Sequence, residues 1–160
     1  MFYFAYGSNM DPRQISRRCP SSIFYSRAIL HDFKLDFTLR SRQRRCGVAN
    51  VVSCKNKNVI GVIYQINSPR DWKRLDAAEG FKDGRDTGNR YTRSVIPTVA
   101  FDKKKTNLLA SIYIGLIEKS PPPPSNAYLD QMIYGAHYWE LPVKYIQGLI
   151  NLKLNLKKKD

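Results

Sequence analysis

Apolar and polar positions recur along this chain with two different periods, which separate the expected strands from the expected helices. Residues 2–6 are continuously apolar or aromatic and end at Gly7, so we expect a buried strand there. Residues 33–37 alternate between apolar and polar with a period of two, which is typical of a strand with one exposed face. The first part of the chain is therefore expected to contribute strands.

Two runs rich in β-branched residues follow at 48–52 and 59–66, and the polar residues 55–58 lie between them. A polar turn between two such runs predicts a β-hairpin. Two more strands are expected at 91–101 and 108–116, on either side of a lysine turn at 103–105.

Capping residues indicate where helices begin. Asp11 is followed by proline at the first helical position, which predicts a short helix to about Arg18. Ser68 is also followed by proline, and the helix that it opens is expected to stop at Gly80. Residues 81–90 are rich in charge and glycine, and we expect them to form a flexible loop.

The last part of the chain is expected to be helical. Prolines at 121–124 form a stiff spacer that neither a helix nor a central strand accommodates. Ser125 caps one helix and Pro142 opens another, both with apolar residues at helical spacing. We therefore expect one α+β domain over residues 1–152, a mixed, mostly antiparallel, barrel-like sheet with surrounding helices, followed by a basic C-terminal tail over 153–160.

The composition is that of a globular protein. The 160 residues are 42% hydrophobic, and no apolar run approaches the roughly 20 residues that a transmembrane helix needs. The first residues carry no basic segment and no small-residue cleavage site, so a secretory signal is not expected. Three cysteines without paired spacing favour neither a disulfide framework nor a zinc site. We expect a cytoplasmic protein that holds no metal and does not associate with a membrane.

The charge is strongly positive, because 27 lysines and arginines outnumber 13 acidic residues and give a net charge of +14. Such a charge attracts phosphate backbones and anionic surfaces. Arg40, Arg42, Arg44 and Arg45 crowd one short stretch between two expected strands. A solvated loop is the favoured interpretation, because no zinc-finger spacing, helix-turn-helix pattern or aromatic-rich binding signature accompanies the cluster. Nucleic acid is therefore not the expected partner.

The turn after the first strand, Gly7-Ser8-Asn9, has features of a binding site. A strand end, a glycine free to adopt positive φ and a helix N-terminus bring several backbone N–H groups together. Such a concavity binds carboxylate or phosphate. The turn lacks the second glycine and the lysine of a phosphate loop, so a carboxylate is the better candidate ligand. An ordinary strand-to-helix turn is the alternative.

Glu79 is the second candidate. It lies at the C-terminal end of its expected helix, where the helix dipole disfavours a negative charge, and no cation stands beside it in the sequence. If this helix end is buried, desolvation and the dipole both raise the pKa of Glu79, as a general acid/base near neutral pH requires. A surface glutamate without a chemical role is the alternative.

A family resemblance rests on three stretches: Tyr6-Gly7-Ser8-Asn9, residues 75–80 around Glu79, and the proline-rich segment that leads to Tyr128 and residues 134–136. Together with residues 31–37, and in this order, they resemble the γ-glutamylcyclotransferase family of the AIG2-like superfamily from Phe4 to about Ile150. With asparagine at position 9, the chain resembles the branch of the family that acts on γ-glutamyl amino acids or γ-glutamylamines, since glutathione-specific relatives usually carry leucine there.

The resemblance implies an enzyme without a metal or an organic cofactor. The α-amine of a γ-glutamyl group attacks its own side-chain carbonyl, closes 5-oxoproline and releases the amine that the group carried. The implied site residues are Glu79 as general acid/base and, around the substrate, Tyr6, Gly7, Ser8, Asn9, Tyr113 and Tyr128. Aromatic core residues are the alternative for the last two tyrosines. The implied partner is a small γ-glutamyl molecule, and family members include homodimers.

Two departures from the family pattern concern the substrate rather than the reaction. The loop 81–90 is longer than usual and is expected to flank the entrance to the site, and the arginines at 40–45 favour an acidic leaving group or an unrelated ligand. Two alternative functions stay open. One is removal of a γ-glutamyl group that protects a biosynthetic intermediate. The other is a non-catalytic member of the fold that binds nucleic acid or an acidic protein through its basic surface.

Overall fold

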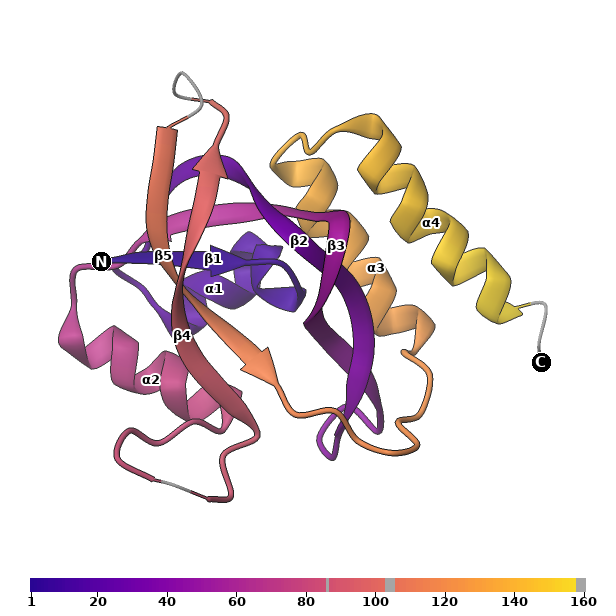
Figure 1. Cartoon of the computed structure of the whole chain (residues 1–160), viewed down its shortest axis with the longest axis horizontal. Coiled ribbons are helices and arrows are strands. Elements are labelled where there is room, and N and C mark those ends of the chain that lie inside the picture. Colours follow the sequence, from indigo (N-terminus) through magenta and orange to yellow (C-terminus); the bar gives the residue numbers. More distant parts are fainter. Residues whose placement is uncertain (86, 103–105, 158–160) are drawn as a thin grey trace.

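The structure, a computed structural model, describes residues 1–85, 87–102 and 106–157 and is built around a closed five-stranded β-barrel (Figure 1). The strands are β1 (Phe2–Ala5), β2 (Ile23–Ser41), β3 (Cys46–Gln65), β4 (Tyr91–Ala100) and β5 (Thr106–Gly115). They follow the order β1-β3-β2-β4-β5, in which β1 and β5 are parallel and the other pairs antiparallel. This confirms the expected α+β fold with a mixed, mostly antiparallel, barrel-like sheet. The lysine turn expected at 103–105 lies outside the described residues.

The long strands β2 and β3 form one hairpin whose turn is at residues 42–45, so the hairpin turn expected at 55–58 is wrong. Residues 55–58 continue β3, and the pairing with β2 shifts register between His31 and Phe33. Asp32 and Asn56 adopt positive φ at this irregularity, and the Asn56 N–H donates to Asp32 Oδ1 at 2.9 Å. The polar run is thus an exposed, bulged part of a paired strand, which a polar composition alone does not distinguish from a turn.

The helices are the short 3₁₀ helix η1 (Ser8–Met10), α1 (Pro12–Arg18), α2 (Pro69–Glu79), α3 (Asn126–Tyr138) and α4 (Val143–Lys157). The expected caps are confirmed: the side chains of Asp11, Ser68 and Ser125 each accept a hydrogen bond from a backbone N–H in the first turn. Gly80 ends α2 in the left-handed conformation, with φ of 67°. None of the described helices is long and apolar enough to cross a membrane.

The C-terminal helix packs beside α3 as an antiparallel pair (Figure 1). It continues through Lys157, so residues 153–157 of the segment that we expected as a tail are helical. Lys153 pairs with Asp130 of α3, which joins this end of α4 to its neighbour. Residues 158–160 lie outside the described part of the chain.

The core holds the segment after β1 in place. Tyr3, Phe4 and Ala5 are buried, and α3 covers η1 at close range. A Cβ built on Gly135 of α3 would lie 2.5 Å from the backbone carbon of Met10, so only glycine permits this approach. The turn that follows β1 is therefore held between the barrel and α3.

Candidate active site

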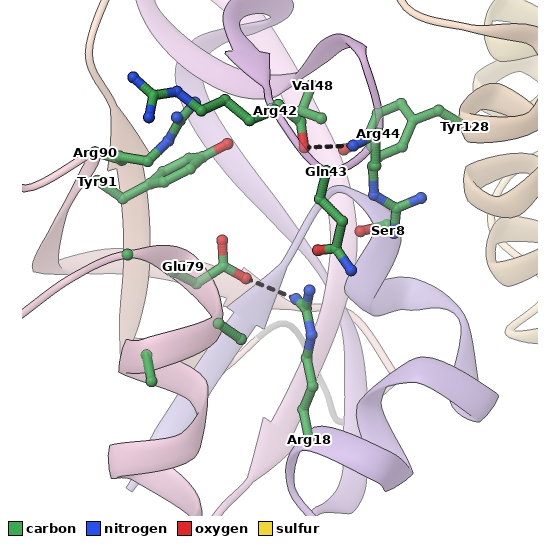
Figure 2. Close-up of a pocket in the computed structure, with 14 residues that line it drawn as sticks. Ser8, Arg18, Arg42, Gln43, Arg44, Val48, Glu79, Arg90, Tyr91 and Tyr128 are labelled. Atoms are coloured by element: carbon green, nitrogen blue, oxygen red, sulfur yellow. Dashed lines mark hydrogen bonds and ion pairs between the residues drawn. The ribbon is translucent and has the colours of Figure 1, made fainter.

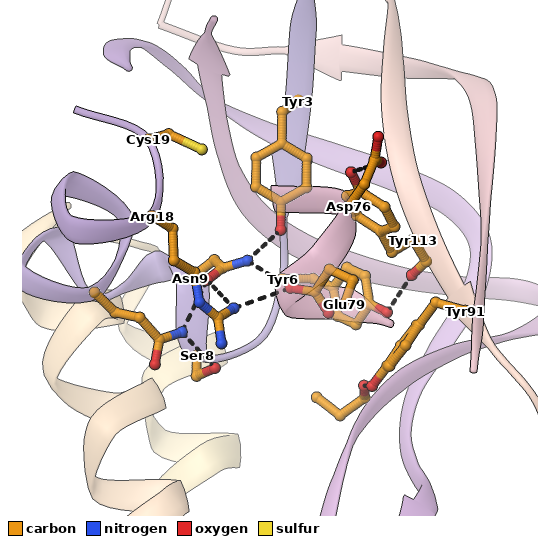
Figure 3. Close-up of polar contacts among 12 residues, drawn as sticks. Tyr3, Tyr6, Ser8, Asn9, Arg18, Cys19, Asp76, Glu79, Tyr91 and Tyr113 are labelled. Carbon is orange, nitrogen blue, oxygen red and sulfur yellow. Dashed lines mark hydrogen bonds and ion pairs between the residues drawn. The ribbon is translucent and has the colours of Figure 1, made fainter. Parts of the chain in front are cut away.

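Glu79, the last residue of α2, reaches a polar cluster near the turn after β1 (Figure 3). Its side chain is 15% exposed, and one oxygen, Oε1, accepts from Asn9 Nδ2 at 2.9 Å and from Arg18 Nη1 at 3.0 Å. Burial raises the pKa of Glu79, while the positive charges of Arg18 and Arg44 and the Asn9 hydrogen bond act in the opposite direction. Burial prevails, so Glu79 releases its proton at a higher pH than an ordinary glutamic acid.

The Asn9 side chain connects Glu79 to the rest of the cluster. Asn9 is 4% exposed, and its Nδ2 also donates to the Tyr3 hydroxyl at 2.7 Å. Its Oδ1 accepts from Gln14 Nε2 and from Arg18 Nη1, both at 2.8 Å. Gln14 Nε2 in turn donates to Ser8 Oγ at 2.8 Å. Asn9 thus positions the carboxylate by its side chain, in addition to the backbone role that the resemblance implies.

The turn itself differs from the expectation in two respects. Gly7 has φ of −113°, so it does not adopt positive φ. The first turn of α1 is occupied by its own cap, because Asp11 Oδ1 accepts the Arg13 N–H at 3.0 Å. The expected anion seat at the N-terminus of α1 is therefore wrong.

The surroundings of Gly7 leave little space for a side chain. A Cβ at this position would lie 3.2 Å from Ala49 Cβ and 3.3 Å from the Tyr128 hydroxyl. Within the part of the chain that the structure describes, the backbone N–H groups of Gly7, Ser8 and Asn9 donate no hydrogen bond. The turn therefore still presents backbone donors beside Glu79, although the helix dipole does not contribute them.

The structure brings every sequence-predicted site residue to one small inner cavity of about 40 Å³. Its lining residues are Tyr3, Tyr6, Gly7, Ser8, Asn9, Ala49, Glu79, Tyr91, Tyr113 and Tyr128. Tyr3, Ala49 and Tyr91 are the members that the sequence did not indicate. Among the described residues, no group of three or more His, Cys, Asp or Glu is placed to hold a metal ion.

The hydroxyl groups of the cavity tyrosines are held by fixed partners. Tyr6 donates to the backbone oxygen of Tyr113 at 2.5 Å, and the Tyr113 hydroxyl donates to Asp76 Oδ1 at 2.6 Å. The Tyr128 hydroxyl accepts the Ala49 N–H at 3.1 Å. Burial is the main cause that raises the pKa values of Tyr6, Tyr113 and Tyr128, so these hydroxyls stay neutral at physiological pH. They form a rigid, uncharged wall opposite the charged cluster.

A larger outer cavity of about 270 Å³ adjoins the inner one and shares Ser8, Glu79, Tyr91 and Tyr128 with it (Figure 2). Among the described residues that line it are four arginines, Arg18, Arg42, Arg44 and Arg90, and one carboxylate, Glu79. Arg42 and Arg44 come from the turn between β2 and β3, and Arg90 comes from the end of the loop after α2. The cluster that we expected as a solvated loop thus supplies part of a cavity wall.

Two polar residues of the cluster, Arg18 and Gln14, could not be predicted from the sequence. Arg18 stands 61 positions before Glu79, and Gln14 reaches Ser8 only because α1 folds back over the turn. Both belong to a helix whose basic residues resemble any solvated face. Tyr3 lies in the continuously apolar first strand, which predicts that it is buried. This pattern does not predict the contact of its hydroxyl with Asn9.

The comparisons with known proteins show the family to which the chain belongs. The family profile described as "Gamma-glutamyl cyclotransferase, AIG2-like" matches residues 3–130. The chain is 33% identical to a Bos taurus gamma-glutamylcyclotransferase and 32% identical to the Homo sapiens protein of that name, each over 96% of this chain and 79% of the relative. The chain therefore belongs to the γ-glutamylcyclotransferase, AIG2-like family.

A solved structure described as "Gamma-glutamyl cyclotransferase" superposes with a TM-score of 0.82 at 29% identity, over 93% of this chain and 85% of that one. A glutathione-specific γ-glutamyl cyclotransferase from yeast superposes with a TM-score of 0.67 at 16% identity, which shows the shared fold alone. The relatives named gamma-glutamylcyclotransferase support an enzyme of this family.

Proposed function

We propose that this protein cyclises the γ-glutamyl group of a γ-glutamyl amino acid or amine to 5-oxoproline and releases the free amine. The observation that carries the proposal is Glu79, a carboxyl of raised pKa, beside the free backbone donors of residues 7–9 in one cavity. The relatives named gamma-glutamylcyclotransferase supply the reaction class. The raised pKa suits a group that must both accept and return a proton near neutral pH.

In the proposed reaction, Glu79 accepts a proton from the α-ammonium of the substrate. The freed amine attacks the γ-carbonyl carbon, a bond forms between this nitrogen and that carbon, and the carbonyl oxygen becomes an oxyanion. When the tetrahedral intermediate collapses, the bond from the same carbon to the leaving nitrogen breaks, and Glu79 returns its proton to that nitrogen. The second proton of the ring nitrogen passes to the released amine, which leaves as an ammonium. Every atom of both products comes from the substrate, and no water is consumed.

The turn after β1 is the proposed donor set for the oxyanion or for the substrate α-carboxylate. Backbone N–H groups that are fixed before the reaction stabilise developing charge without reorganisation. Those of Gly7, Ser8 and Asn9 meet this condition, because η1 is held by the hydrogen bond from the Met10 N–H to the Gly7 oxygen at 3.0 Å. A mobile loop at this point would lose much of the benefit.

The tyrosine wall is the proposed device that folds the substrate. An intramolecular attack gains most from positioning, for which effective molarities of about 10⁵–10⁸ M are known. The inner cavity, about 40 Å³, is smaller than a whole γ-glutamyl group, so the substrate has to extend into the outer cavity past Glu79. This places the scissile bond near the residues that both cavities share.

The experiment that tests the proposal measures release of 5-oxoproline from γ-glutamyl amino acids and γ-glutamylamines by the wild type and by Glu79→Gln. Glu140→Gln is the matched control, because Glu140 is exposed in the link between α3 and α4. We expect activity in the wild type and the control and a loss of about 10²–10⁴-fold in Glu79→Gln. An inert wild type, or an active Glu79→Gln variant, refutes the proposal.

A further inference from the structure

We infer that the amine released by this enzyme carries two carboxylates, as a dicarboxylic amino acid does, and that Arg42 and Arg90 bind these carboxylates. The inference rests on the proposed function, since it concerns the leaving half of the same substrate. The proposed function leaves γ-glutamyl amino acids and γ-glutamylamines open as substrates. The inference favours the amino acids, because it disfavours neutral and cationic amines as leaving groups.

Among the residues that the structure describes, the outer cavity carries more positive charge than its carboxylates compensate. Arg18 is paired with Glu79 at 3.0 Å. In the described part of the chain, Arg42, Arg44 and Arg90 form no ion pair with a carboxylate. Uncompensated guanidinium groups around a cavity raise the local concentration of anions, and they bind carboxylates in a bidentate manner.

The contacts that these arginines do make are with neutral groups, which hold the side chains without cancelling their charge. Arg44 Nη2 donates to Gln14 Oε1 at 2.7 Å, and the guanidinium lies 4.9 Å from the centre of the Tyr128 ring. Arg90 donates to the backbone oxygen of Arg40, which ties the loop after α2 to the β2–β3 hairpin. The arginines are therefore set up for a ligand rather than for an internal ion pair.

Their places around Glu79 separate two binding positions. Figure 2 shows Arg42 and Arg90 on the side of the cavity next to Tyr91, and Arg44 on the side next to Ser8 and Tyr128. The γ-glutamyl half of the substrate is expected in the inner cavity, beside Ser8. The leaving half then lies in the outer cavity, where an amino acid with one carboxylate satisfies one guanidinium and leaves a second without a partner.

The size of the cavity favours a small ligand. A concave site of about 270 Å³ accommodates an amino acid. The same charges act against a leaving group with an additional ammonium, because like charges brought together at a site repel. A γ-glutamyl derivative of a dicarboxylic amino acid is therefore the substrate whose leaving half fits both the volume and the charge of the outer cavity.

The test compares three substrates at low salt: γ-glutamyl-glutamate, γ-glutamyl-alanine and γ-glutamyl-1,4-diaminobutane. We expect kcat/KM for the glutamate substrate to exceed that for the alanine substrate by about tenfold, because charge-assisted contacts with carboxylates are the strong ones. The diamine substrate is expected to be the poorest. The preference should decrease as salt is raised, because surface charges are screened over about 10 Å at 0.1 M ionic strength.

Arg42→Gln combined with Arg90→Gln identifies the source of the preference. We expect kcat/KM of this double variant to fall for both substrates, and to fall about tenfold further for the glutamate substrate than for the alanine substrate, so that the preference for glutamate is lost. Arg70→Gln is the matched control, because Arg70 is exposed on α2 and outside the cavity, and it should keep the preference. Unfolding temperatures of the variants show whether each is folded at the assay temperature, since Arg90→Gln also removes the contact with the Arg40 oxygen.

The outcomes separate this inference from the function on which it rests. Turnover of γ-glutamyl-alanine without a preference for the glutamate substrate overturns the inference and leaves the proposed function intact. A preference that persists in the double variant also overturns it, since another group would then bind the second charge. Absence of 5-oxoproline from all three substrates refutes the proposed function and the inference together.

Discussion

Replacing Asn9 by leucine removes an amide that makes contacts on both of its polar atoms. The buried side chain donates to Tyr3 and Glu79 and accepts from Gln14 and Arg18. Leucine has the branched shape of asparagine but cannot form these hydrogen bonds, and its methyl groups need more room than the contacts of 2.7–2.9 Å provide. The substitution therefore acts through lost hydrogen bonds and through displaced neighbours. Leucine is also the residue that glutathione-specific relatives usually carry at this position.

The expected loss of stability follows from those contacts. A hydrogen bond to a charged group is worth about 1.5–3 kcal/mol, and a buried hydroxyl left without its partner costs about 1–3 kcal/mol. Arg18 and Glu79 keep their direct contact at 3.0 Å, and Gln14 keeps Ser8, so the sum lies near the lower end of the range. We expect the free energy of unfolding to fall by about 3 kcal/mol.

The loss should also depend on pH. The Asn9 hydrogen bond lowers the pKa of Glu79 against the effect of burial, so its removal raises that pKa further. A carboxyl whose pKa is raised in the folded state costs stability as pH rises through the window between its unfolded and folded pKa values. The deficit of Asn9→Leu relative to the wild type is therefore greater at pH 8 than at pH 5.

Urea unfolding at both pH values, followed by the fluorescence of Trp72 and Trp139, measures this deficit. Asn107→Leu is the control, because Asn107 is exposed on β5 and should change stability by less than about 0.5 kcal/mol. If Asn9→Leu loses no more than the control, or if its deficit does not grow with pH, the argument about the Asn9 cluster is wrong.

Four further substitutions test other parts of the structure. Arg18→Gln removes the charge that most lowers the pKa of Glu79, so the acidic limb of the kcat/KM profile should move to higher pH, and a limb that stays in place contradicts the pairing. Tyr128→Phe leaves the buried Ala49 N–H without its acceptor and should cost about 1–3 kcal/mol in urea unfolding; a variant as stable as the wild type would show that this bond is unimportant. Gly135→Ala forces α3 away from Met10 and should lower the free energy of unfolding by more than about 2 kcal/mol. In Gly148→Ala the added Cβ meets no atom within 4 Å, so this control should stabilise α4 by up to about 1 kcal/mol. Equal shifts of the unfolding temperature in the two variants would argue against the close packing at Gly135.

The sequence predicts those parts of the fold that depend on local interactions. Asp11, Ser68 and Ser125 cap the helices at which they were expected, because a cap needs only its own first turn. The hairpin expected at 55–58 fails for the opposite reason. Whether a polar run turns or continues as a bulged strand depends on the partner strand, and β2 is long enough to pair beyond it.

The candidate site also combines residues that the sequence indicates locally with contacts that only the fold creates. The helix end at Glu79 and the motif at Tyr6 to Asn9 are visible in the chain, and the fold brings them to one cavity. The contact of Arg18 with Glu79 is not visible, because it joins residues of two different helices. Gly7 was expected to adopt a positive φ, whereas its φ is −113° and a Cβ there would be in tight contact with Ala49, at 3.2 Å.

Product analysis in ¹⁸O-labelled water tests the central claim most directly. The wild-type protein is incubated with a γ-glutamyl amino acid, and the products are identified by mass spectrometry. An attack by the substrate's own amine gives 5-oxoproline without ¹⁸O. Glutamate that carries ¹⁸O would show attack by water instead and would contradict the proposed function.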